Sequence, residues 1–207
     1  MTDNELTPSS EELNVSVLDV IRAYDASLEV WSAALDQRSK EAKGHTHRVM
    51  EMALNMARVL GMSKHELINI RRGALLHDFG NIAVPESILL KKGELTLEEW
   101  LSIHMHPYIA YEMLAPIEFL KPALEIPYRH HEHWDGSGYP RGLKGEEIPL
   151  AARLFSVVDV FDSMTSERPY RSAWSKKEAM DYIQDMAGKQ FDPMAVELFF
   201  MMNNQVQ

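Results

Sequence analysis

The sequence predicts an all-α fold, in which one N-terminal helix precedes a single helical bundle domain. Apolar residues near the N-terminus recur in alternating steps of four and three, a spacing typical of one face of a helix. They are Val17, Ile21, Tyr24, Leu28, Trp31 and Leu35. The capping-box pattern of a helix start, a serine or threonine followed three residues later by glutamate, occurs at Ser63, Thr96 and Ser175. Alternating apolar and polar runs, which would predict strands, are scarce.

The expected elements can be placed in order along the chain. Residues 1–13 are polar and predict a disordered tail. Residues 14–37 form the N-terminal helix, which either packs on the domain or acts as a regulatory or dimerising helix. Residues 38–207 form the domain, with helices expected over 43–60, 64–78, 97–114, 117–131, 149–165, 175–187 and 193–202. Proline and glycine in the stretches 80–95 and 135–148 predict long loops there.

The composition limits the classes of protein to which this chain can belong. Its 207 residues are 45% hydrophobic and 25% charged, as in soluble globular domains. The net charge of −10 argues against binding to nucleic-acid polymers, which requires a basic surface. We find no membrane-spanning run and no signal peptide, and we expect a cytoplasmic protein. Because cysteine is absent, imidazole and carboxylate groups must bind any metal ion.

The segment His130–Pro140, HHEHWDGSGYP, carries the strongest functional signal. His130 and His131 are adjacent, and neutral imidazole is the commonest side-chain ligand for first-row metal ions. Gly136 and Gly138 make the following loop permissive, so that backbone and ligand can approach each other closely. The segment therefore indicates a site that holds a metal ion and a substrate together.

Further candidate metal ligands are spread along the chain. Glu41 and His45 are four residues apart, which would place both on one face of a helix. His77 and Asp78 end an apolar helical segment, and the two oxygens of such an aspartate can bridge two ions that clamp a phosphate. The remaining candidates are His106 and Asp159.

The order of these motifs resembles that of the HD-GYP family, metal-dependent phosphodiesterases of the HD superfamily. The similarity extends over roughly residues 36–200. In chain order it comprises His45, His77-Asp78, His106-Pro107, the HHE–DGSGYP segment and Asp159 followed by RPYR at 168–171. A single HD dipeptide is weak evidence, whereas the ordered set is specific.

The resemblance implies a binuclear metal centre. Its ligands would be His45, His77, Asp78, His106, His130, His131 and Asp159. Glu41 stands where some family members have a glutamate that holds a third ion, although it would also suit an ordinary surface position. Iron or manganese is favoured, and zinc or nickel would also suit these donors.

The resemblance also implies an activity. Family members hydrolyse cyclic di-GMP, or cyclic GMP-AMP, to the linear dinucleotide and often to GMP, by means of a metal-activated hydroxide. His77 and Asp78 would be catalytic, and Tyr139 and Tyr170 would stack on guanine or donate a hydrogen bond. Guanidinium groups bind phosphate with planar forks, which suits Arg141, Arg168 and Arg171.

Asn81 departs from the family pattern, which has a lysine at this catalytic position. Losing a cation there would cost a few kcal/mol of transition-state stabilisation, or about a hundredfold in rate. One alternative is therefore a weak or inactive module that binds metal, nucleotide or a signalling protein through its GYP loop. Another is a general phosphohydrolase acting on a mononucleotide, which the GYP loop disfavours.

The remaining histidines are expected to have ordinary roles. They are His47, His65, His104 and His133. On a continuous helix, His104 would point away from His106. We recognise no receiver, PAS or GAF domain, so we expect regulation through residues 14–37, for instance in a homodimer, or through a separate partner.

Overall fold

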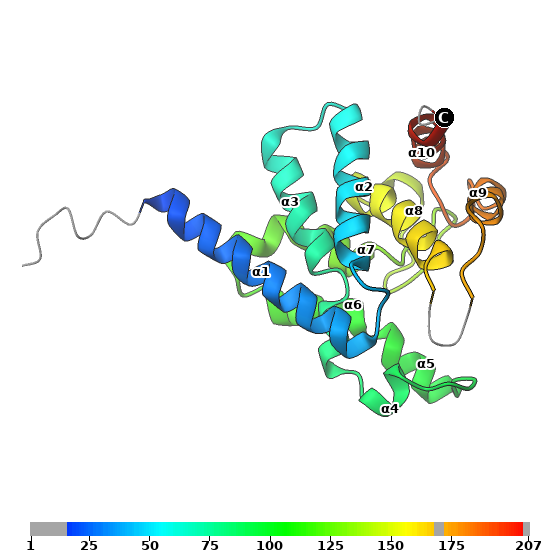
Figure 1. Cartoon of the computed structure of the whole chain (residues 1–207), viewed down its shortest axis with the longest axis horizontal. Coiled ribbons are helices and arrows are strands. Elements are labelled where there is room, and N and C mark those ends of the chain that lie inside the picture. The colour runs from blue at the N-terminus through cyan, green and yellow to red at the C-terminus, as the bar shows by residue number, and fades with distance from the viewer. Residues whose placement is uncertain (1–15, 168–171, 205–207) are drawn as a thin grey trace, which may run out of the picture.

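The computed structural model describes residues 16–167 and 172–204, and these residues form an all-α bundle (Figure 1). Its longer helices are α1 (Val17–Ser39), α2 (His45–Val59), α3 (Lys64–Leu75), α5 (Leu97–His104), α6 (His106–Leu114), α8 (Leu150–Thr165), α9 (Lys176–Asp185) and α10 (Pro193–Asn204). Shorter pieces are η1 (Phe79–Ala83), α4 (Glu86–Leu89), η2 (Glu118–Leu124), α7 (Glu125–Arg129) and η3 (Gly145–Glu147). Within these ranges there is no strand, only an isolated bridge between Ala187 and Phe191. The predicted fold class is therefore confirmed, while the tail expected over 1–13 lies outside the described residues.

Two predicted helices are interrupted. The helix expected over 97–114 is divided at Met105 into α5 and α6, with Pro107 in the first turn of α6. Proline suits that position because it has no N–H to donate to the preceding turn. The helix expected over 117–131 begins as η2, which contains Pro122, and becomes α-helical only in α7. The expected loop 80–95 contains most of η1 and all of α4, and the expected loop 135–148 contains η3.

Helix α2 packs against α3 on one side and α8 on the other, and α7 contacts both α3 and α8. Their facing sides supply much of one continuous apolar core, including Val49, Leu75, Phe155 and Val158. Burying such side chains stabilises the fold by roughly 1.5–3 kcal/mol each. This core gives rigid support to the helix ends that carry the candidate ligands.

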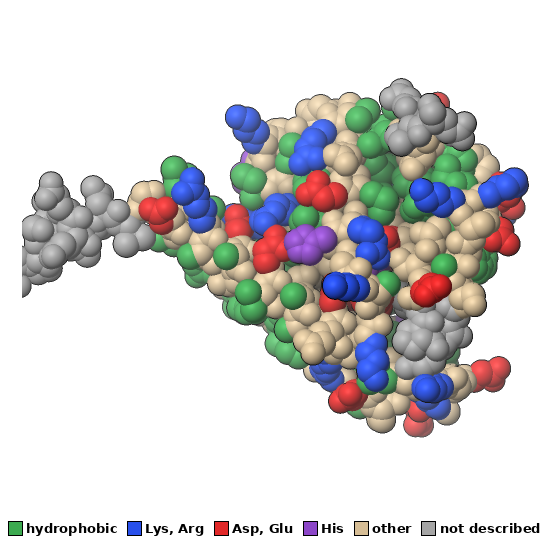
Figure 2. All heavy atoms as spheres, viewed as in Figure 1, with side chains coloured by type: hydrophobic (Ala, Val, Ile, Leu, Met, Phe, Trp, Pro, Cys, Tyr) green, Lys and Arg blue, Asp and Glu red, His purple; other side chains and the backbone are tan. Residues whose placement is uncertain are grey.

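Helix α1 is attached to the bundle along only part of its length. Its N-terminal half projects from the rest of the described structure (Figure 1). Leu28 and Leu35 of the predicted stripe are buried, whereas Val17 and Tyr24 are 76% and 50% exposed. Asp25 pairs with Arg72 Nε on α3 at 2.8 Å. Because α1 packs on the bundle along only part of its length, some of its apolar side chains stay on the surface, where Figure 2 shows them.

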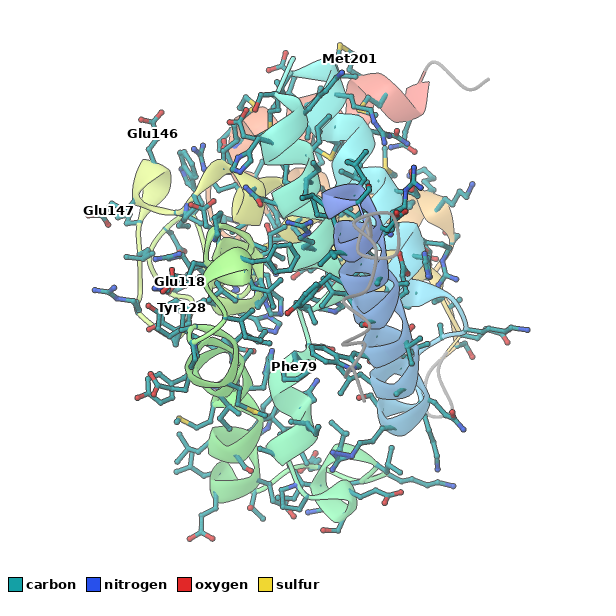
Figure 3. The ribbon with its side chains drawn as sticks, turned by 90° about the vertical axis from the view of Figure 1, so that its left-hand side faces the viewer. Phe79, Glu118, Tyr128, Glu146, Glu147 and Met201 are labelled. Carbon is teal, nitrogen blue, oxygen red and sulfur yellow. The ribbon has the colours of Figure 1, made fainter. Side chains whose placement is uncertain are left out.

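Near its C-terminal end, α1 contacts the segment that follows the His77-Asp78 pair. Arg38 donates hydrogen bonds to the carbonyl oxygens of Ile82 at 2.8 Å and Val84 at 2.7 Å. Trp31 contacts the ring of Phe79, which lies beside α1 in Figure 3. None of the helices in the described ranges is both long and apolar enough to cross a bilayer.

Candidate metal centre

Most of the predicted ligands lie at helix ends that meet at one place in the fold. His45 is the first residue of α2, and His106 is the first residue of α6. His77 and Asp78 lie between α3 and η1. His130 and His131 follow α7, while Asp159 lies within α8. The structure thus brings seven predicted ligands, separated by more than a hundred residues of sequence, into one cluster.

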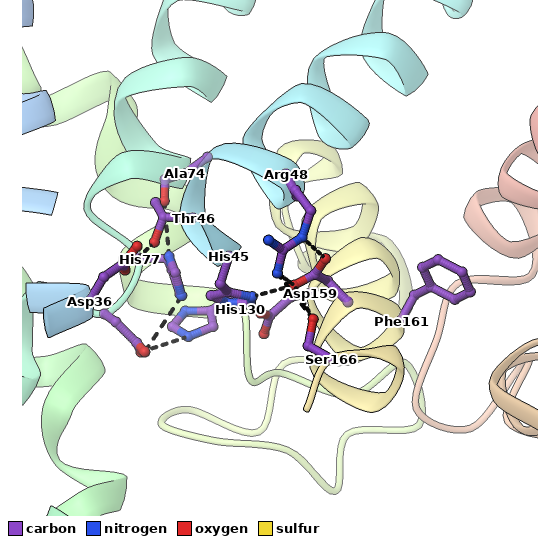
Figure 4. Close-up of polar contacts among 12 residues, drawn as sticks. Asp36, His45, Thr46, Arg48, Ala74, His77, His130, Asp159, Phe161 and Ser166 are labelled. Atoms are coloured by element: carbon purple, nitrogen blue, oxygen red, sulfur yellow. Dashed lines mark hydrogen bonds and ion pairs between the residues drawn. The ribbon is translucent and has the colours of Figure 1, made fainter. Parts of the chain in front are cut away.

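These seven side chains form two adjoining groups with metal-binding geometry. Asp78, His106, His130 and His131 offer ligand atoms that all lie within 4.8 Å of one another. His45, His77 and Asp159 form a second group under the same limit. Figure 4 shows His45, His77 and His130 converging between the ends of their helices. Each group contains both imidazole nitrogen and carboxylate oxygen, the donors that suit iron, manganese or zinc.

Asp78 faces both groups. Its Oδ1 lies 3.4 Å from His106 Nε2 and 4.0 Å from His130 Nε2. Its Oδ2 lies 3.5 Å from His77 Nε2. Because each oxygen is directed toward a different set of imidazoles, this single carboxylate is placed to bridge two ions.

Backbone carbonyls set the orientation of three of the rings. His77 Nδ1 lies 2.9 Å from the oxygen of Ala74, and His106 Nδ1 lies 2.8 Å from that of Ile103. His130 Nδ1 lies 3.0 Å from the oxygen of Ile126. A carbonyl oxygen only accepts hydrogen bonds, so Nδ1 carries the proton in each ring and the lone pair is on Nε2. All three Nε2 atoms face the cluster, as metal ligation requires.

His45 is oriented by a carboxylate instead. Its Nδ1 lies 2.7 Å from Asp162 Oδ2, and its Nε2 lies 3.3 Å from Asp159 Oδ1. Arg48 in turn donates to Asp162 through Nε at 2.6 Å and Nη2 at 2.8 Å. Asp162 was not among the site residues predicted from the sequence. Its spacing of three residues from Asp159 on one helix was the available signal.

The protonation states differ within the cluster. Burial, together with the neighbouring His106 and His77, lowers the pKa of His130 to about 4. Burial likewise lowers the pKa of His131 well below its usual value, so both rings are neutral. Burial opposes the charge on His45, but its hydrogen bonds with Asp159 and Asp162 raise its pKa to about 10. Binding of an ion to His45 Nε2 would therefore displace a proton.

The arrangement fits metal ions better than it fits an ordinary hydrogen-bond network. His106 Nε2 and His130 Nε2 lie only 3.5 Å apart, and both carry lone pairs because their protons are on Nδ1. Two lone pairs that face each other repel unless a positive charge lies between them. Although burial opposes ionisation, the surrounding imidazoles lower the pKa of Asp78, which therefore stays a carboxylate.

The cluster opens into a cavity of about 470 Å³, large enough to admit a ligand. The predicted third-ion residue Glu41 and the departure Asn81 both line it. Asn81 is buried, and its Oδ1 has no hydrogen-bond partner among the described residues. A buried amide oxygen of this kind calls for a partner other than the described residues.

The GYP loop is shaped largely by its own chain. Glu132 is buried and accepts hydrogen bonds from the backbone N–H groups of Arg141 at 2.8 Å and Leu143 at 2.9 Å. A Cβ added to Gly138 would lie 2.4 Å from the oxygen of His131. Gly138 therefore lets the loop approach its own backbone, rather than a ligand. Glu132 was not among the site residues predicted from the sequence, although an acid between paired histidines and a glycine-rich loop was a visible signal.

Tyr139 is stacked between two imidazoles. Its ring centroid lies 4.1 Å from that of His104 and 4.7 Å from that of His131, and the three planes are nearly parallel. Two imidazoles stacked this closely on one face of a tyrosine would touch each other. Among the described residues His104 and His131 make no ring contact, so they cover opposite faces of Tyr139. The tyrosine lines the cavity but has no free face for a guanine. His104 belongs to neither metal-binding group, as expected, but its contact with Tyr139 was not predicted from the sequence.

The other predicted substrate contacts are less well placed. The side chain of Arg141 is exposed and is not among the residues that line the cavity. Arg168, Tyr170 and Arg171 lie outside the described residues. His47 pairs with Glu29, and His133 contacts Ser137 within the GYP loop, so neither belongs to the two metal-binding groups.

The chain is similar to several known proteins. A family model described as an HD domain matches residues 29–195. The chain is 40% identical over 189 residues to the cyclic di-GMP phosphodiesterase response regulator RpfG of Xanthomonas campestris, covering 90% of this chain and 50% of that protein. It is 39% identical to a cyclic di-GMP phosphodiesterase of Thermotoga maritima, covering 86% of this chain and 49% of the relative. The chain thus spans about half the length of these curated relatives.

A third relative and two solved structures extend the comparison. The chain is 35% identical to the 3'3'-cGAMP-specific phosphodiesterase 2 of Vibrio cholerae, covering 80% of this chain and 32% of the relative. A crystal structure of a cyclic GMP-AMP specific phosphodiesterase of V. cholerae, V-cGAP3, matches 88% of this chain and 49% of its own, with a TM-score of 0.63 at 22% identity. An HDGYP protein of Bdellovibrio bacteriovorus matches 77% of this chain and 51% of its own, with a TM-score of 0.62 at 21% identity. At this identity the two structures show a common fold.

Proposed function

The chain belongs to the HD-GYP family of HD-domain proteins, and we propose that it is a metal-dependent phosphodiesterase that hydrolyses cyclic di-GMP. The observation that carries the proposal is the pair of adjoining nitrogen and oxygen donor groups, with Asp78 facing both, at the cavity of about 470 Å³. The proposal favours an active enzyme over an inactive binding module, because the curated relatives at 35–40% identity are named phosphodiesterases.

We propose that His45, His77 and Asp159 hold one divalent ion and that His106, His130 and His131 hold a second, with Asp78 shared between them. Iron or manganese is proposed for both positions. Glu41 is proposed as a ligand of a third ion. When bound, such ions would supply positive charge for the phosphate oxygens and a nucleophilic water at neutral pH. The backbone carbonyls and Asp162 keep the imidazoles directed at the cluster, so little reorganisation is needed on binding.

The substrate class follows from the relatives and from the cavity. Hydrolysis adds water to phosphorus and breaks its bond to a ribose oxygen, which gives the linear dinucleotide and, after a second cleavage, GMP. One relative is named for 3'3'-cGAMP, so cyclic GMP-AMP is the alternative substrate. Because both faces of Tyr139 are covered, we propose that this residue contacts the substrate through its hydroxyl edge. Arg168 and Arg171 remain proposed phosphate ligands.

The proposed organisation follows the chain. Residues 14–37 serve as a regulatory or dimerising helix and residues 38–207 as the catalytic domain. The exposed apolar residues of α1 support pairing with a second copy, which light scattering at several concentrations would test. A signalling protein docking at the GYP loop is the alternative source of regulation. A reducing compartment such as the cytoplasm fits the absence of cysteine.

The proposal is tested by assaying cyclic di-GMP and cyclic GMP-AMP hydrolysis with anaerobically prepared protein loaded with iron or manganese. We expect turnover of cyclic di-GMP by the native chain and about two ions per chain by metal analysis. The combined variant His77→Ala and Asp78→Ala should lose both ions while its far-ultraviolet circular dichroism stays helical. If that variant kept two ions, the proposed ligands would be wrong. Metal-loaded native protein that binds cyclic di-GMP without cleaving it would refute the enzyme and support the binding module.

A further inference from the structure

We propose that Lys40 is a substrate-binding residue, whose ammonium group contacts a phosphate of the cyclic dinucleotide beside the metal centre. The inference rests on the proposed function and adds a residue to that site. Lys40 follows the last residue of α1 and lines the same cavity as His45, His77 and Asp159. Three independent features of this lysine support the assignment.

The first feature is the balance of charge around the cavity. Its lining includes three carboxylates, Glu41, Asp78 and Asp159, and two lysines, Lys40 and Lys91. Lys91 is neutralised by Glu99, whose Oε2 lies 2.5 Å from its Nζ. The ammonium of Lys40 makes no hydrogen bond or ion pair with any residue in the described ranges. It is thus the cavity lysine whose charge is available to a phosphate.

The second feature is the backbone conformation. Lys40 has φ 52° and ψ 36°, and it is the single non-glycine residue with positive φ in the part of the chain that the structure describes. A side chain at such a position is disfavoured, and glycine is the usual residue after a helix end. Gly44 and Gly61 occupy the two nearest positive-φ positions, as expected. The turn does not require a lysine, so the presence of this side chain has to be explained by something other than the turn.

The third feature is the fixed position of the lysine backbone. The backbone N–H of Lys40 donates a hydrogen bond to the carbonyl oxygen of Asp36, and this bond closes the last turn of α1. Arg38, two residues earlier, is bonded to the carbonyl oxygens of Ile82 and Val84. These contacts hold the end of α1 against the segment that follows Asp78. A flexible four-carbon side chain on a fixed backbone can reach a phosphate without the loop having to move.

The experiment compares Lys40→Gly and Lys40→Arg with the native chain. Steady-state hydrolysis of cyclic di-GMP would be measured at two salt concentrations, together with metal content and melting temperature. Lys43→Ala is the matched control, because Lys43 is an exposed lysine of the same loop that does not line the cavity. Its backbone carbonyl, which accepts a hydrogen bond from Arg48, is kept in alanine.

We expect Lys40→Gly to raise KM about tenfold with a smaller change in kcat, as loss of one charge-assisted phosphate contact predicts. The effect should shrink at high salt, and Lys40→Arg should restore most of the affinity. Metal content should be unchanged, and the melting temperature should be unchanged or higher because glycine suits this backbone. If Lys40 served only the turn, Lys40→Gly would keep the native KM at both salt concentrations.

The result also separates this proposal from the proposed function. If the native chain is active and Lys40→Gly has the same KM, the proposed role of Lys40 is refuted while the proposed function stands. If the native chain is inactive, the dissociation constant of cyclic di-GMP is measured instead through the fluorescence of Trp100, which lines the cavity. Weaker binding by Lys40→Gly would then support Lys40 although the enzyme proposal has failed. Equal binding by both proteins, or no binding by either, would overturn the proposed role of Lys40.

Discussion

At the scale of single residues, the hydrogen-bond partners of the imidazoles prepare the candidate centre for metal. His45 differs from the other proposed ligands because its Nδ1 contacts Asp162, which in turn accepts a hydrogen bond from Arg48. A ligand oriented in this way loses less freedom when an ion binds, and the carboxylate raises the basicity of the ring. Asn81 is the opposite case, a buried polar side chain whose oxygen lacks a partner among the described residues.

Asp162→Asn should weaken the binding of one ion and leave the binding of the other unchanged. The amide keeps the size of the side chain but removes the charge that orients His45 and binds Arg48. We expect the group of His45, His77 and Asp159 to lose about 10–100-fold in metal affinity, as other outer partners of metal ligands do. Titration calorimetry with manganese would show two classes of site in the native protein and only one unchanged in the variant. Equal weakening of both classes would contradict this assignment.

Asn81→Lys should raise the rate of hydrolysis. Asn81 is buried and lines the cavity, so a lysine there would add a positive charge close to the phosphate. We expect kcat to rise by roughly ten- to a hundredfold, with metal content unchanged. Asn81→Met is the matched control, since it lengthens the side chain without adding charge. A similar gain in both variants would show that shape rather than charge limits the native enzyme.

At the scale of elements, the site depends on short segments that pack without space for side chains. η1 lies against the start of α6, so that Asp78 comes next to His106. Gly80 makes this contact possible, because a Cβ there would lie 1.9 Å from the backbone oxygen of His106. The restriction is one of space between two backbones, as at Gly138 in the GYP loop.

Gly80→Ala should therefore damage both stability and metal binding. The added methyl group must push η1 away from α6, and we expect a loss of roughly 2–4 kcal/mol in the free energy of unfolding. Gly93→Ala is the control, because a Cβ at Gly93 meets nothing within 4 Å. The control should stay within about 0.5 kcal/mol of the native protein in urea unfolding. Equal stability of the two variants would show that η1 moves freely relative to α6.

At the scale of the whole molecule, the centre lies where helices from distant parts of the chain pack together. The proposed ligands come from α2, the α3–η1 junction, α6, the end of α7 and α8. An ion bound to several of them stabilises the folded state relative to the unfolded one by mass action. The bundle therefore has a core that folds the helices and a polar centre that metal would reinforce.

Metal loading should raise the melting temperature. At an ion concentration 100 times the dissociation constant, one site adds about 2.7 kcal/mol, or roughly 5–10 °C for a chain of this size. Calorimetry of metal-free and manganese-loaded protein would measure the shift, and a chelator should reverse it. The combined His77→Ala and Asp78→Ala variant should show no shift. A shift of native size in that variant would place the stabilising ion elsewhere.

The sequence alone determined the fold class, most helices and the set of candidate ligands. Apolar periodicity and capping boxes are local signals, and the structure shows the capping boxes at Ser63, Thr96 and Ser175. The candidate ligands could be named from the sequence because histidine pairs and HD dipeptides in a fixed order have few structural explanations. The order along the chain could not, however, show which histidine belongs to which group.

Only the tertiary structure decided the grouping of the ligands, the support of His45 by Asp162, and the enclosure of Tyr139 between His104 and His131. These features depend on where helices from distant parts of the chain end relative to one another. The contact of His104 with Tyr139 likewise depends on where the end of α5 lies relative to the GYP loop. Local periodicity reports which face of a helix is apolar, whereas packing fixes which side chains meet across two helices.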